Sequence, residues 1–426
     1  MKVLIVGGGG REHALAWCAA SSPRVSNVWV APGNAGTALE DKVTNVDISA
    51  DDIDALLELA QQEAIDLTIV GPEAPLVAGI VDRFQAAGLA CFGPQAAAAQ
   101  LEGSKAYAKA FMQRHGIPTA AYARFDDFDN ALEYVNNQSL PIVIKADGLA
   151  AGKGVVIATT LAEAELALRA MLCDDTFGSA GAEVVIEDFL AGEEASFIVL
   201  ASGEDFIEFP TSQDHKRLGE GDTGPNTGGM GAYSPAPVVT PAVRQRIIDQ
   251  VIRPTLAGLQ ADGTPYTGFL YAGLMIDVQG NPQVLEFNCR MGDPETQPLL
   301  LRLRSDLTEL LQQALSGKLA SQQAEWDPRC SIGVVLAAGG YPASYAKGLP
   351  ITGLDSITDD AVKVFHAGTR ADAQGQILTS GGRVLAVCAL GDDLVAARGR
   401  AYAAAGQIRF DDVYLRHDIG HRALAT

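Results

Sequence analysis

The feature that most restricts the fold of this sequence is a regular exchange of short apolar runs and helical patterns between residues 2 and 92. Strands that alternate with helices in this way form a parallel sheet with helices on both faces. We therefore expect an open α/β domain at the N-terminus. The predicted strands, rich in β-branched residues, are 2–6, 27–30, 66–70 and 90–92, and the predicted helices are 11–20, 51–63 and 76–87.

A second series of elements begins at Ser104, which is placed to cap a helix that ends near His115. Thr160 and Glu163 have the spacing of a capping box, so another helix is expected from there to Leu172. The stretch 123–188 has strands and a helix of its own, which indicates a small subdomain inserted into a larger unit. The strands predicted in this series are 141–146, 155–158, 183–187 and 195–200.

No regular element is predicted between Pro210 and Val239, where six glycines and four prolines interrupt every pattern. A stretch of this length without structure inside a compact domain is usually functional or disordered. The remainder, from about Asp327, is predicted to be a small α/β unit. The elements expected after the stretch are a helix starting at Pro241, strands 268–278 and 283–288, a helical region to about Gly317, strands 331–337 and 383–390, and a helix at 393–405.

Acidic residues greatly outnumber basic ones, and this excess excludes several classes of function. The chain has 52 Asp and Glu against 31 Lys and Arg, a net charge of −21, so it lacks the basic surface that general nucleic-acid binders and binders of anionic membranes need. A single anionic ligand in a locally positive pocket remains compatible with this charge. Apolar residues at 48% and charged residues at 19% exclude a disordered protein, and 426 residues suggest roughly three domains.

The cysteines are scattered and include no close pair at metal-ligand spacing, so we interpret them as reduced and mostly buried thiols. The apolar run at 3–6 is too short for a signal peptide, and no segment has the length to span a bilayer. These observations predict an intracellular, cytoplasmic protein. The six cysteines are Cys18, Cys91, Cys173, Cys289, Cys330 and Cys388.

The first predicted strand continues into four glycines, residues 7–10, at the start of a helix. Free backbone N–H groups and the positive end of the helix dipole make such a turn an anion site. The dinucleotide fingerprint G-x-G-x-x-G fails, because Glu12 or His13 stands where the third glycine belongs. We expect either a site for a single phosphate or only a tight turn.

Two further loops rich in Gly and Pro, 32–37 and 71–76, also follow predicted strands. In an open α/β sheet, ligands bind outside the carboxyl ends of the strands, so three such loops at one edge predict a pocket. Turn formation alone is the alternative, because Gly, Pro and Asn supply it anyway.

The loop from Lys145 to Gly154 is similar to a P-loop but does not match it. Three residues rather than four separate Gly148 from Gly152, and no hydroxyl follows Lys153. Lys145 ends an otherwise apolar strand, where an unpaired ammonium is costly and an anionic partner would relieve the cost. We expect a nucleoside triphosphate site here; two solvated charges around a turn are the alternative.

Acidic residues at two strand ends have two interpretations. Glu187 ends one predicted strand and Glu194 follows shortly after it. A carboxylate that binds ribose, beside a backbone contact to a base, is one interpretation, and solvated side chains are the other.

The predicted strand at 283–288 alternates polar and apolar residues. Glu286 and Asn288 are expected on one face, with Leu285, Phe287 and Cys289 on the other. Two oxygen ligands at positions i and i+2 suit Mg²⁺, which keeps its remaining positions for phosphates and water. An exposed face of the sheet is the alternative.

Taken together, these features occur in the order and spacing of the ATP-grasp superfamily, and the chain resembles its glycinamide ribonucleotide synthetase (phosphoribosylamine–glycine ligase) family over essentially its whole length. The motif at 211–237 is the specific one, whereas short glycine loops are weak signals alone. The matching stretches are GGGGREHALAW, APGNAGTALE, TIVGPEAPLVAGIVD, LEGSKA, IPTAAY, PIVIKADGLAAGKGV, GEEASFIVL, TSQDHKRLGEGDTGPNTGGMGAYSPAP, TGFLYAGLMID, EFNCRMGDPETQP and AAGGYP.

The resemblance implies an α/β chain of three domains: an N-terminal open parallel sheet at 1–102, an ATP-grasp domain at 103–327 with a lid subdomain at about 123–188, and a small C-terminal α/β domain at 328–426. It implies a cytoplasmic ligase of purine biosynthesis that joins glycine to 5-phosphoribosylamine through glycyl phosphate, with ATP as substrate and Mg²⁺ or Mn²⁺ as metal. Its partners are then small molecules, with no nucleic acid and no membrane, and the chain is a monomer or at most a weak homodimer.

The resemblance also assigns roles to residues of this sequence. Those expected at ATP are Lys105, Lys145, Gly148, Gly152, Lys153, Gly154, Glu187, Phe189, Leu190 and Glu194. Those expected at glycine, the acyl phosphate or the ribose phosphate are Gly8, Gly9, Gly10, Asn34, Gly36, Thr37, Glu73, Asp214, Asn226, Thr227, Gly228, Gly229, Arg290 and Asp293. The residues expected to take part in catalysis are Lys145, Asp214 and Arg290, and those expected to bind the metal are Glu286 and Asn288.

Several questions remain open at this point. Many members of the superfamily carry an acidic metal ligand where this chain has Leu274 and Met275; Asp277 is close in sequence, so one metal ion or two are possible. A related ligase or carboxylase that uses formate or bicarbonate is the alternative within the superfamily. A nicotinamide oxidoreductase lacks its fingerprint here, and a nucleotide sensor would bind ATP without turnover.

Overall fold

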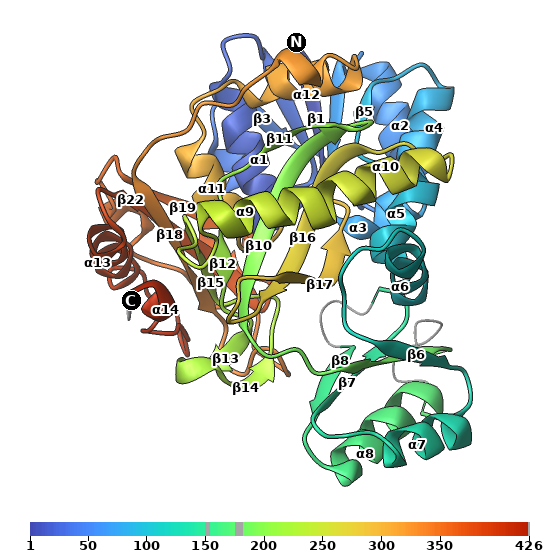
Figure 1. The fold of residues 1–426 in the computed structure, drawn as a ribbon. Coiled ribbons are helices and arrows are strands. Elements are labelled where there is room, and N and C mark those ends of the chain that lie inside the picture. The colour runs from blue at the N-terminus through green and yellow to red at the C-terminus, as the bar shows by residue number, and fades with distance from the viewer. Residues whose placement is uncertain (150–153, 175–181, 425–426) are drawn as a thin grey trace.

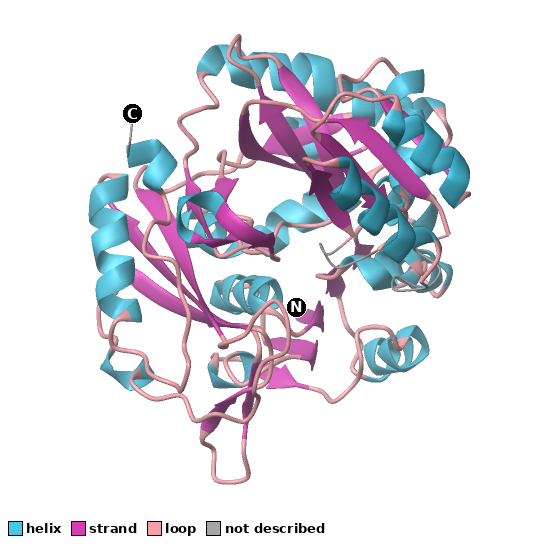
Figure 2. Cartoon of the chain, turned by 90° about the horizontal axis from the view of Figure 1, so that it is seen from below, coloured by secondary structure: helices cyan, strands magenta, loops and turns pink. Residues whose placement is uncertain are grey.

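The computed structural model describes residues 1–149, 154–174 and 182–424. Its N-terminal α/β unit, its lid and its C-terminal unit surround a central antiparallel sheet (Figure 1). The strands are gathered into separate sheets, which Figure 2 shows from below.

The N-terminal unit is the predicted parallel sheet, with strand order β3-β2-β1-β4-β5. One predicted helix is two helices, because Gly79 has φ 87° and this left-handed residue ends the turn that precedes it. The strands are β1 (Lys2–Gly7), β2 (Asn27–Pro32), β3 (Val43–Asn45), β4 (Leu67–Val70) and β5 (Cys91–Phe92). The helices are α1 (Gly10–Ser21), α2 (Ile53–Gln62), α3 (Glu73–Val77), α4 (Ile80–Ala86) and α5 (Ala96–Gly103).

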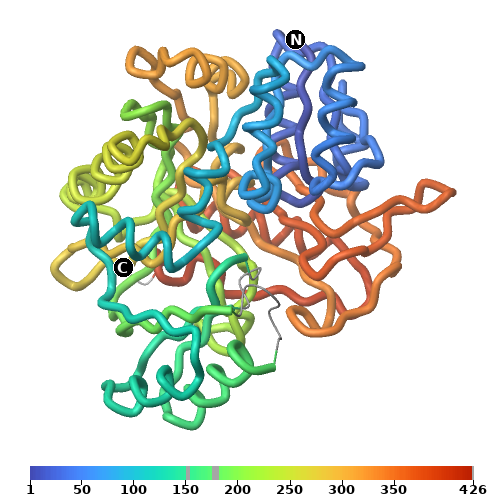
Figure 3. Tube along the Cα trace, turned by 90° about the vertical axis from the view of Figure 1, so that its right-hand side faces the viewer, coloured from blue at the N-terminus to red at the C-terminus, as the bar shows by residue number. Residues whose placement is uncertain are grey.

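The lid is an antiparallel sheet of order β6-β9-β7-β8 that has an apolar core of its own. Two helices pack on this sheet, and the lid stands apart from the other units (Figure 3, green, at the bottom). Thr160 and Glu163 form the predicted capping box at the start of its second helix. The elements are β6 (Tyr122–Phe125), α7 (Phe128–Asn136), β7 (Ile142–Ala146), β8 (Val155–Ala158), α8 (Leu161–Leu172) and β9 (Val184–Asp188).

The central sheet has the antiparallel order β11-β10-β16-β17 and is covered by helices. The predicted cap is present, since the side chain of Ser104 accepts a backbone N–H bond at the start of α6. α9 begins at Pro241 as expected, and Thr240 caps it. The strands are β10 (Glu193–Ser202), β11 (Asp205–Glu208), β16 (Thr267–Ile276) and β17 (Pro282–Asn288). The helices are α6 (Lys105–Arg114), α9 (Pro241–Ile247), a π-helical turn (Ile248–Ile252), α10 (Arg253–Ala261), α11 (Thr296–Arg302) and α12 (Leu307–Leu315).

The structure overturns the prediction that no regular element lies between Pro210 and Val239. Four short strands lie there, and β15 pairs with β18 about a hundred residues later in the chain. Strands of two to four residues are too short to show an alternation of period 2, and their partner is remote. The four are β12 (Gln213–Asp214), β13 (Arg217–Gly219), β14 (Thr223–Asn226) and β15 (Gly231–Ser234).

The C-terminal sheet thus contains strands from both sides of residue 327, in the order β12-β15-β18-β22-β19. Its own elements are β18 (Cys330–Ala337), β19 (Val362–His366), β20 (Thr369–Ala371), β21 (Ile377–Thr379), β22 (Arg383–Gly391), α13 (Leu394–Ala405) and α14 (His421–Leu424). Short 3₁₀ turns lie at Thr37–Leu39, Glu220–Asp222, Leu319–Ser321 and Leu354–Ser356.

One apolar core connects the N-terminal, central and C-terminal units. It joins Ile5 of β1 and Leu15 of α1 to Leu200 of β10, Leu299 of α11 and Phe365 of β19. The three units therefore pack as one body around the site, whereas the lid has a separate core. The division of the chain at residues 102 and 327 stays our prediction.

Candidate active site

Lys145, the last residue but one of β7, lies in a buried network rather than in solvent. Its Nζ lies 2.8 Å from Glu187 Oε1 and donates to the Leu285 carbonyl at 3.0 Å. Glu187 also lies 3.0 Å from the Nζ of Lys109, and burial lowers the pKa of Lys109 to about 8. The Glu187 carboxylate is thus engaged by two ammonium groups. Next in the chain, Phe189 is exposed and Leu190 is half-buried.

The start of α6 lies against the loop that follows β7. Lys105 donates from Nζ to the carbonyl of Gly148 at 2.7 Å, and burial lowers its pKa. Asp147, a residue that sequence reasoning missed, accepts from Ser104 Oγ and from the backbone N–H of Ala106. Of the other predicted ATP residues in this loop, Gly154 accepts from the Ala146 N–H, while Gly152 and Lys153 lie outside the described residues.

β17 contains a bulge that shapes the site. Gly273 pairs with Glu286 but Leu274 pairs with Val284, so Leu285 is the extra residue. The apolar face therefore holds Val284, Phe287 and Cys289, and the prediction that Leu285 lies on it is wrong. The bulge directs the Leu285 carbonyl to Lys145, which ties the lid to the central sheet.

Lys216 is the main residue that sequence reasoning left unassigned. Its Nζ lies 3.4 Å from Glu194 Oε2 and 3.4 Å from Glu286 Oε1. Although burial opposes it, the two carboxylates raise the pKa of Lys216 well above its ordinary value. Lys216 in turn lowers the pKa of Glu286 to about 2, with Lys145, Lys105 and Arg290 adding to the effect. The signal in the sequence was its spacing of two from Asp214, which puts both side chains on one face of an extended segment.

Asp214 is buried on β12, beside these charges. Burial raises its pKa to about 8, although Lys216 opposes the shift. The nearby carboxylates of Glu295, Glu194 and Glu286 raise it further.

The residues expected to bind metal satisfy the requirements of a hard cation. Glu286 and Asn288 leave β17 on the same face, and the low pKa of Glu286 keeps its carboxylate ionised. Asp277 is not a further ligand, because it lies in the exposed β16–β17 turn and accepts N–H bonds from Gln279 and Asn281 there. The residue opposite Glu286 on β16 is Gly273.

Arg290 joins the central sheet to the N-terminal unit. Its Nε lies 3.2 Å from Glu73 Oε2, and its Nη2 lies 2.8 Å from Glu102 Oε1. Glu102 also accepts from the backbone N–H of Cys289, and burial raises its pKa to about 7. Glu73 was a predicted residue, whereas Glu102 was missed because nothing local distinguishes it from a solvated helix residue.

The glycine turn at the start of α1 holds a side chain of the protein itself. Glu12 accepts the Gly9 N–H at 2.6 Å and pairs with Arg11 at 2.6 Å. A Cβ at Gly71 would lie 2.1 Å from Glu12 Oε1, so glycine there makes room for this carboxylate. Of the predicted Gly8, Gly9 and Gly10, the first contributes its carbonyl to Asn34 and the last begins the helix.

Asn34 and Thr37 stabilise the second loop from within. Asn34 donates to the carbonyls of Gly8 and His366 and accepts the N–H groups of Gly36 and Thr37. The side chains of Asn34 and Thr37 are both used in hydrogen bonds within the protein. Any contact to a ligand would therefore come from the loop backbone. This engagement between the N-terminal and C-terminal units was not predicted.

The loop after β14 is fixed by the C-terminal unit. Thr227 donates to the Lys216 carbonyl at 2.9 Å, and its Oγ1 accepts the Gly229 N–H. Arg383 donates to the carbonyls of Gly228 and Asp293, and its Nη2 lies 3.2 Å from Asp293 Oδ2. Asn226, at the end of β14, pairs with Arg217 of β13.

The structure therefore brings the predicted Lys105, Lys145 and Arg290, from three different segments, together with Lys216 close enough to Glu286 to lower its pKa. Lys145 of the lid sheet bonds to the central antiparallel sheet, whose strand β17 carries Glu286 and Asn288. Two such sheets with these side chains between them define an ATP-grasp ligase. The chain belongs to the phosphoribosylglycinamide synthetase family. The family's N domain matches residues 1–102, its ATP-grasp (A) domain matches residues 103–296 and its C domain matches residues 331–422.

Curated relatives match the chain from end to end. A phosphoribosylamine–glycine ligase of Vibrio cholerae is 61% identical over 425 residues, covering 100% of this chain and 99% of the relative. A phosphoribosylamine–glycine ligase of Escherichia coli is 61% identical over 426 residues, with the same coverage.

Solved structures show the same architecture. A phosphoribosylamine–glycine ligase of Thermotoga maritima superposes with a TM-score of 0.85 at 34% identity, covering 98% of this chain and 100% of that one. The biotin carboxylase domain of Hydrogenobacter thermophilus 2-oxoglutarate carboxylase, solved with MgADP, has a TM-score of 0.75 at 15% identity over 97% of this chain and 91% of that one, which is a likeness of fold alone. Within the described residues, no helix has both the length and the apolar character needed to cross a bilayer.

Proposed function

We propose that this chain joins glycine to 5-phosphoribosylamine with the conversion of ATP to ADP and phosphate, a step of purine biosynthesis that yields glycinamide ribonucleotide. The supporting observation is the convergence of Lys105, Lys145, Lys216 and Arg290 on Glu286. In a chain of net charge −21, such a concentration of cations suits a polyanion and its metal. The full-length relatives carry the matching ligase name.

The chemistry occurs between substrates. The glycine carboxylate attacks the γ-phosphate of ATP, which releases ADP and forms glycyl phosphate. The amine of phosphoribosylamine then attacks the glycyl carbonyl, phosphate leaves and the amine loses a proton. No protein nucleophile is required, so the chain contributes position and neutralisation of charge.

In this proposal Lys105 and Lys145 contact the ATP phosphates, with Gly148 and the rest of the loop to Gly154 above them. Glu194 binds the ribose, and the stretch from Glu187 through Phe189 to Leu190 meets the adenine. The bond from Lys145 Nζ to the Leu285 carbonyl at 3.0 Å supports this placement, because it holds the ammonium at the junction of lid and central sheet.

Glu286 and Asn288 would hold Mg²⁺ or Mn²⁺. The metal neutralises phosphate charge when it is bound, and carboxylate and amide oxygens are its preferred ligands. Lys216, 3.4 Å from Glu286, balances the same carboxylate.

The remaining assignments concern the two other substrates. Asp214, Arg290 and the loop Asn226, Thr227, Gly228 and Gly229 would bind glycine and the acyl phosphate. The ribose phosphate would lie against Gly8, Gly9, Gly10, Asn34, Gly36, Thr37, Glu73 and Asp293. The contact of Arg290 with Glu73 supports these two assignments, because it brings the residue that follows β17 next to the N-terminal unit.

The test follows ADP release by the purified chain with ATP, Mg²⁺ and phosphoribosylamine, to which glycine, formate or bicarbonate is added in turn. We expect ADP and glycinamide ribonucleotide to form only with glycine. Turnover with formate or bicarbonate but not with glycine would replace the proposal by a related ligase or carboxylase.

A cytoplasmic location and a monomeric state, or at most a weak homodimer, are part of the proposal. All six cysteines are free, and the most buried are Cys91, Cys289 and Cys388, which suits a reducing compartment. Cell fractionation and sedimentation of the purified protein would test the two statements.

A further inference from the structure

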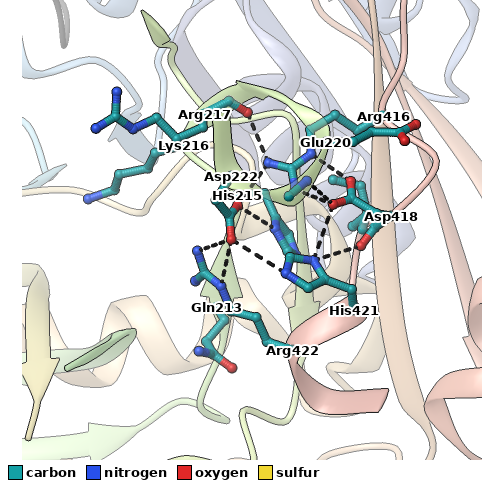
Figure 4. Close-up of polar contacts among 12 residues, drawn as sticks. Gln213, His215, Lys216, Arg217, Glu220, Asp222, Arg416, Asp418, His421 and Arg422 are labelled. Atoms are coloured by element: carbon teal, nitrogen blue, oxygen red, sulfur yellow. Dashed lines mark hydrogen bonds and ion pairs between the residues drawn. The ribbon is translucent and has the colours of Figure 1, made fainter. Parts of the chain in front are cut away.

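The segment around β12 presents alternate residues to two different environments. Lys216 reaches Glu194 and Glu286, and Asp214 is subject to the same charges. His215, between them, is fully buried on the opposite side, against the C-terminal stretch 414–422, which we name the C-terminal clamp. Figure 4 shows Lys216 extending away from the cluster that contains His215. The position of His215 therefore sets the direction in which Asp214 and Lys216 point.

His215 is held by two hydrogen bonds of defined direction. Its Nε2 accepts the backbone N–H of Gly420 at 2.9 Å, so this nitrogen carries no proton. The proton of the neutral ring is then on Nδ1, which lies 3.4 Å from Asp222 Oδ1. Burial also lowers the pKa of His215, in agreement with a neutral ring.

Asp222 connects His215 to the C-terminal clamp. Its Oδ1 lies 3.0 Å from Arg416 Nη1, and its Oδ2 accepts from Arg422 Nε at 3.0 Å and Nη2 at 2.7 Å. Asp222 has φ 55°, which a non-glycine residue adopts only when its surroundings hold it. Its neighbour Gly221 donates to Asp418 of the clamp at 2.8 Å. The turn between β13 and β14 is thereby attached to the end of the chain.

A metal site is the other interpretation of this cluster, and the charges exclude it. Ligand atoms of His215, Asp222 and His421 lie within 4.8 Å of one another. However, two guanidinium groups already surround the Asp222 carboxylate, and a backbone N–H occupies His215 Nε2. Two adjacent positive charges disfavour a cation, so the cluster is an ion-pair network.

Regular strand pairing covers only part of this segment. β12 has two paired residues, the β13–β14 ladder shifts register after Arg217, and single backbone bonds join His215 to Gly231 and Met230. Side chains add to this order. Arg416 does so directly, since it is fully buried and also donates to the Arg217 carbonyl at 3.0 Å.

We propose that Asp222 is a positioning residue of the ligase: through His215, Arg416 and Arg422 it fixes the C-terminal clamp against β12, and so aims Asp214 and Lys216 at the substrates. Asp222 itself touches no reacting atom. The inference rests on the proposed function, which places glycine at Asp214. A shift of about 1 Å in such groups reduces a rate by up to about 100-fold.

The test uses full-length Asp222→Asn. We expect kcat/KM for glycine, at saturating ATP, to fall by about 10- to 100-fold, a larger change than that in the Kd for ATP measured without glycine, which Lys216 affects only through Glu194 and Glu286. Asp327→Asn is the matched control, because Asp327 is also paired with two arginines, Arg304 and Arg329, but between α12 and β18. It should lower thermal stability and leave kcat/KM for glycine unchanged.

Arg422→Gln removes the arginine side of the ion pair with Asp222 and should also lower kcat/KM for glycine. This variant tests the positioning role if Asp222→Asn does not fold. A kcat/KM for glycine equal to that of Asp327→Asn in these variants would overturn the inference. Asp214→Asn and Lys216→Met distinguish failure of the positioning role from failure of the proposed function. If these two variants lower kcat/KM for glycine and the Asp222 and Arg422 variants do not, only the positioning role is wrong. If all four variants leave kcat/KM for glycine unchanged, the assignment of glycine to Asp214 is wrong as well.

Discussion

At the scale of single residues, the site resolves a conflict between the charge of the whole chain and that of its substrates. A net charge of −21 repels ATP and a sugar phosphate, yet Lys216, Lys145 and Lys105 lower the pKa of Glu286 to about 2. The carboxylate is thereby kept ionised inside a local excess of positive charge. This is the arrangement in which a divalent cation and a phosphate chain each meet opposite charge.

Replacing Glu286 tests the assignment of the metal. We expect Glu286→Ala to reduce Mg²⁺-dependent turnover by at least about 100-fold without loss of fold, since the side chain is partly exposed and only its charge is required. Asp277→Ala is the control, because Asp277 lies on the same hairpin but in its exposed turn. Turnover and circular dichroism would be measured together. Equal Mg²⁺ dependence in the two variants would refute the metal role of Glu286.

At the scale of secondary structure elements, local signals decided what the sequence could predict. The capping box at Thr160 and Glu163 and the cap at Ser104 are present as expected. Each depends on residues within one helical turn, so the sequence contains the whole interaction. The bulge at Leu285 was missed, because it exists only in the pairing of β17 with β16.

The lid offers a test at this scale, because it has an apolar core separate from the rest. Thr160 Oγ1 accepts the Glu163 N–H at 3.2 Å at the start of α8. We expect Thr160→Ala to destabilise the lid by about 1 kcal/mol. Amide exchange in α8 and β8 should then be faster by about fivefold, with exchange in the N-terminal sheet unchanged.

Thr358→Ala is the matched control, since Thr358 is exposed and lies outside helices and strands. If amide exchange in α8 were the same in both variants, the cap would have no part in the stability of the lid.

At the scale of the whole molecule, ion pairs of aspartate with arginine fix the joins between units. Asp222 attaches the C-terminal clamp to the β13–β14 hairpin through Arg416, and Asp418 of the clamp accepts the Gly221 N–H of that hairpin. Asp327 pairs with two arginines before β18. His13 performs a similar function at another join, where its Nδ1 accepts the His366 N–H across the N-terminal and C-terminal units.

These aspartates predict the response to acid. Arg329 lowers the pKa of Asp327, and Arg416 lowers that of Asp418 to about 2 against the effect of burial. A carboxyl whose pKa is lower in the folded state stabilises the fold above its ordinary pKa of about 4, and the contribution is lost as pH falls through the folded value. We expect the free energy of unfolding in urea to decrease between about pH 4 and pH 2.

In the variant Asp327→Asn, the free energy of unfolding should decrease less between about pH 4 and pH 2, because this variant lacks one of these carboxyls. A free energy of unfolding that stayed constant from about pH 5 to about pH 2.5 would contradict the account.

The sequence by itself determined the parallel N-terminal sheet, the capped starts of α6 and α8, the candidate ligands Glu286 and Asn288, and the family. Each of these is encoded in periodicity, caps or motifs within a short window. Only the tertiary structure decided that β15 pairs with β18, that Lys216 lies between two carboxylates, and that residues 414–422 hold Asp222. Those contacts join segments far apart in the chain, where no local pattern records the partner, and their energy depends on a burial that only the complete fold provides.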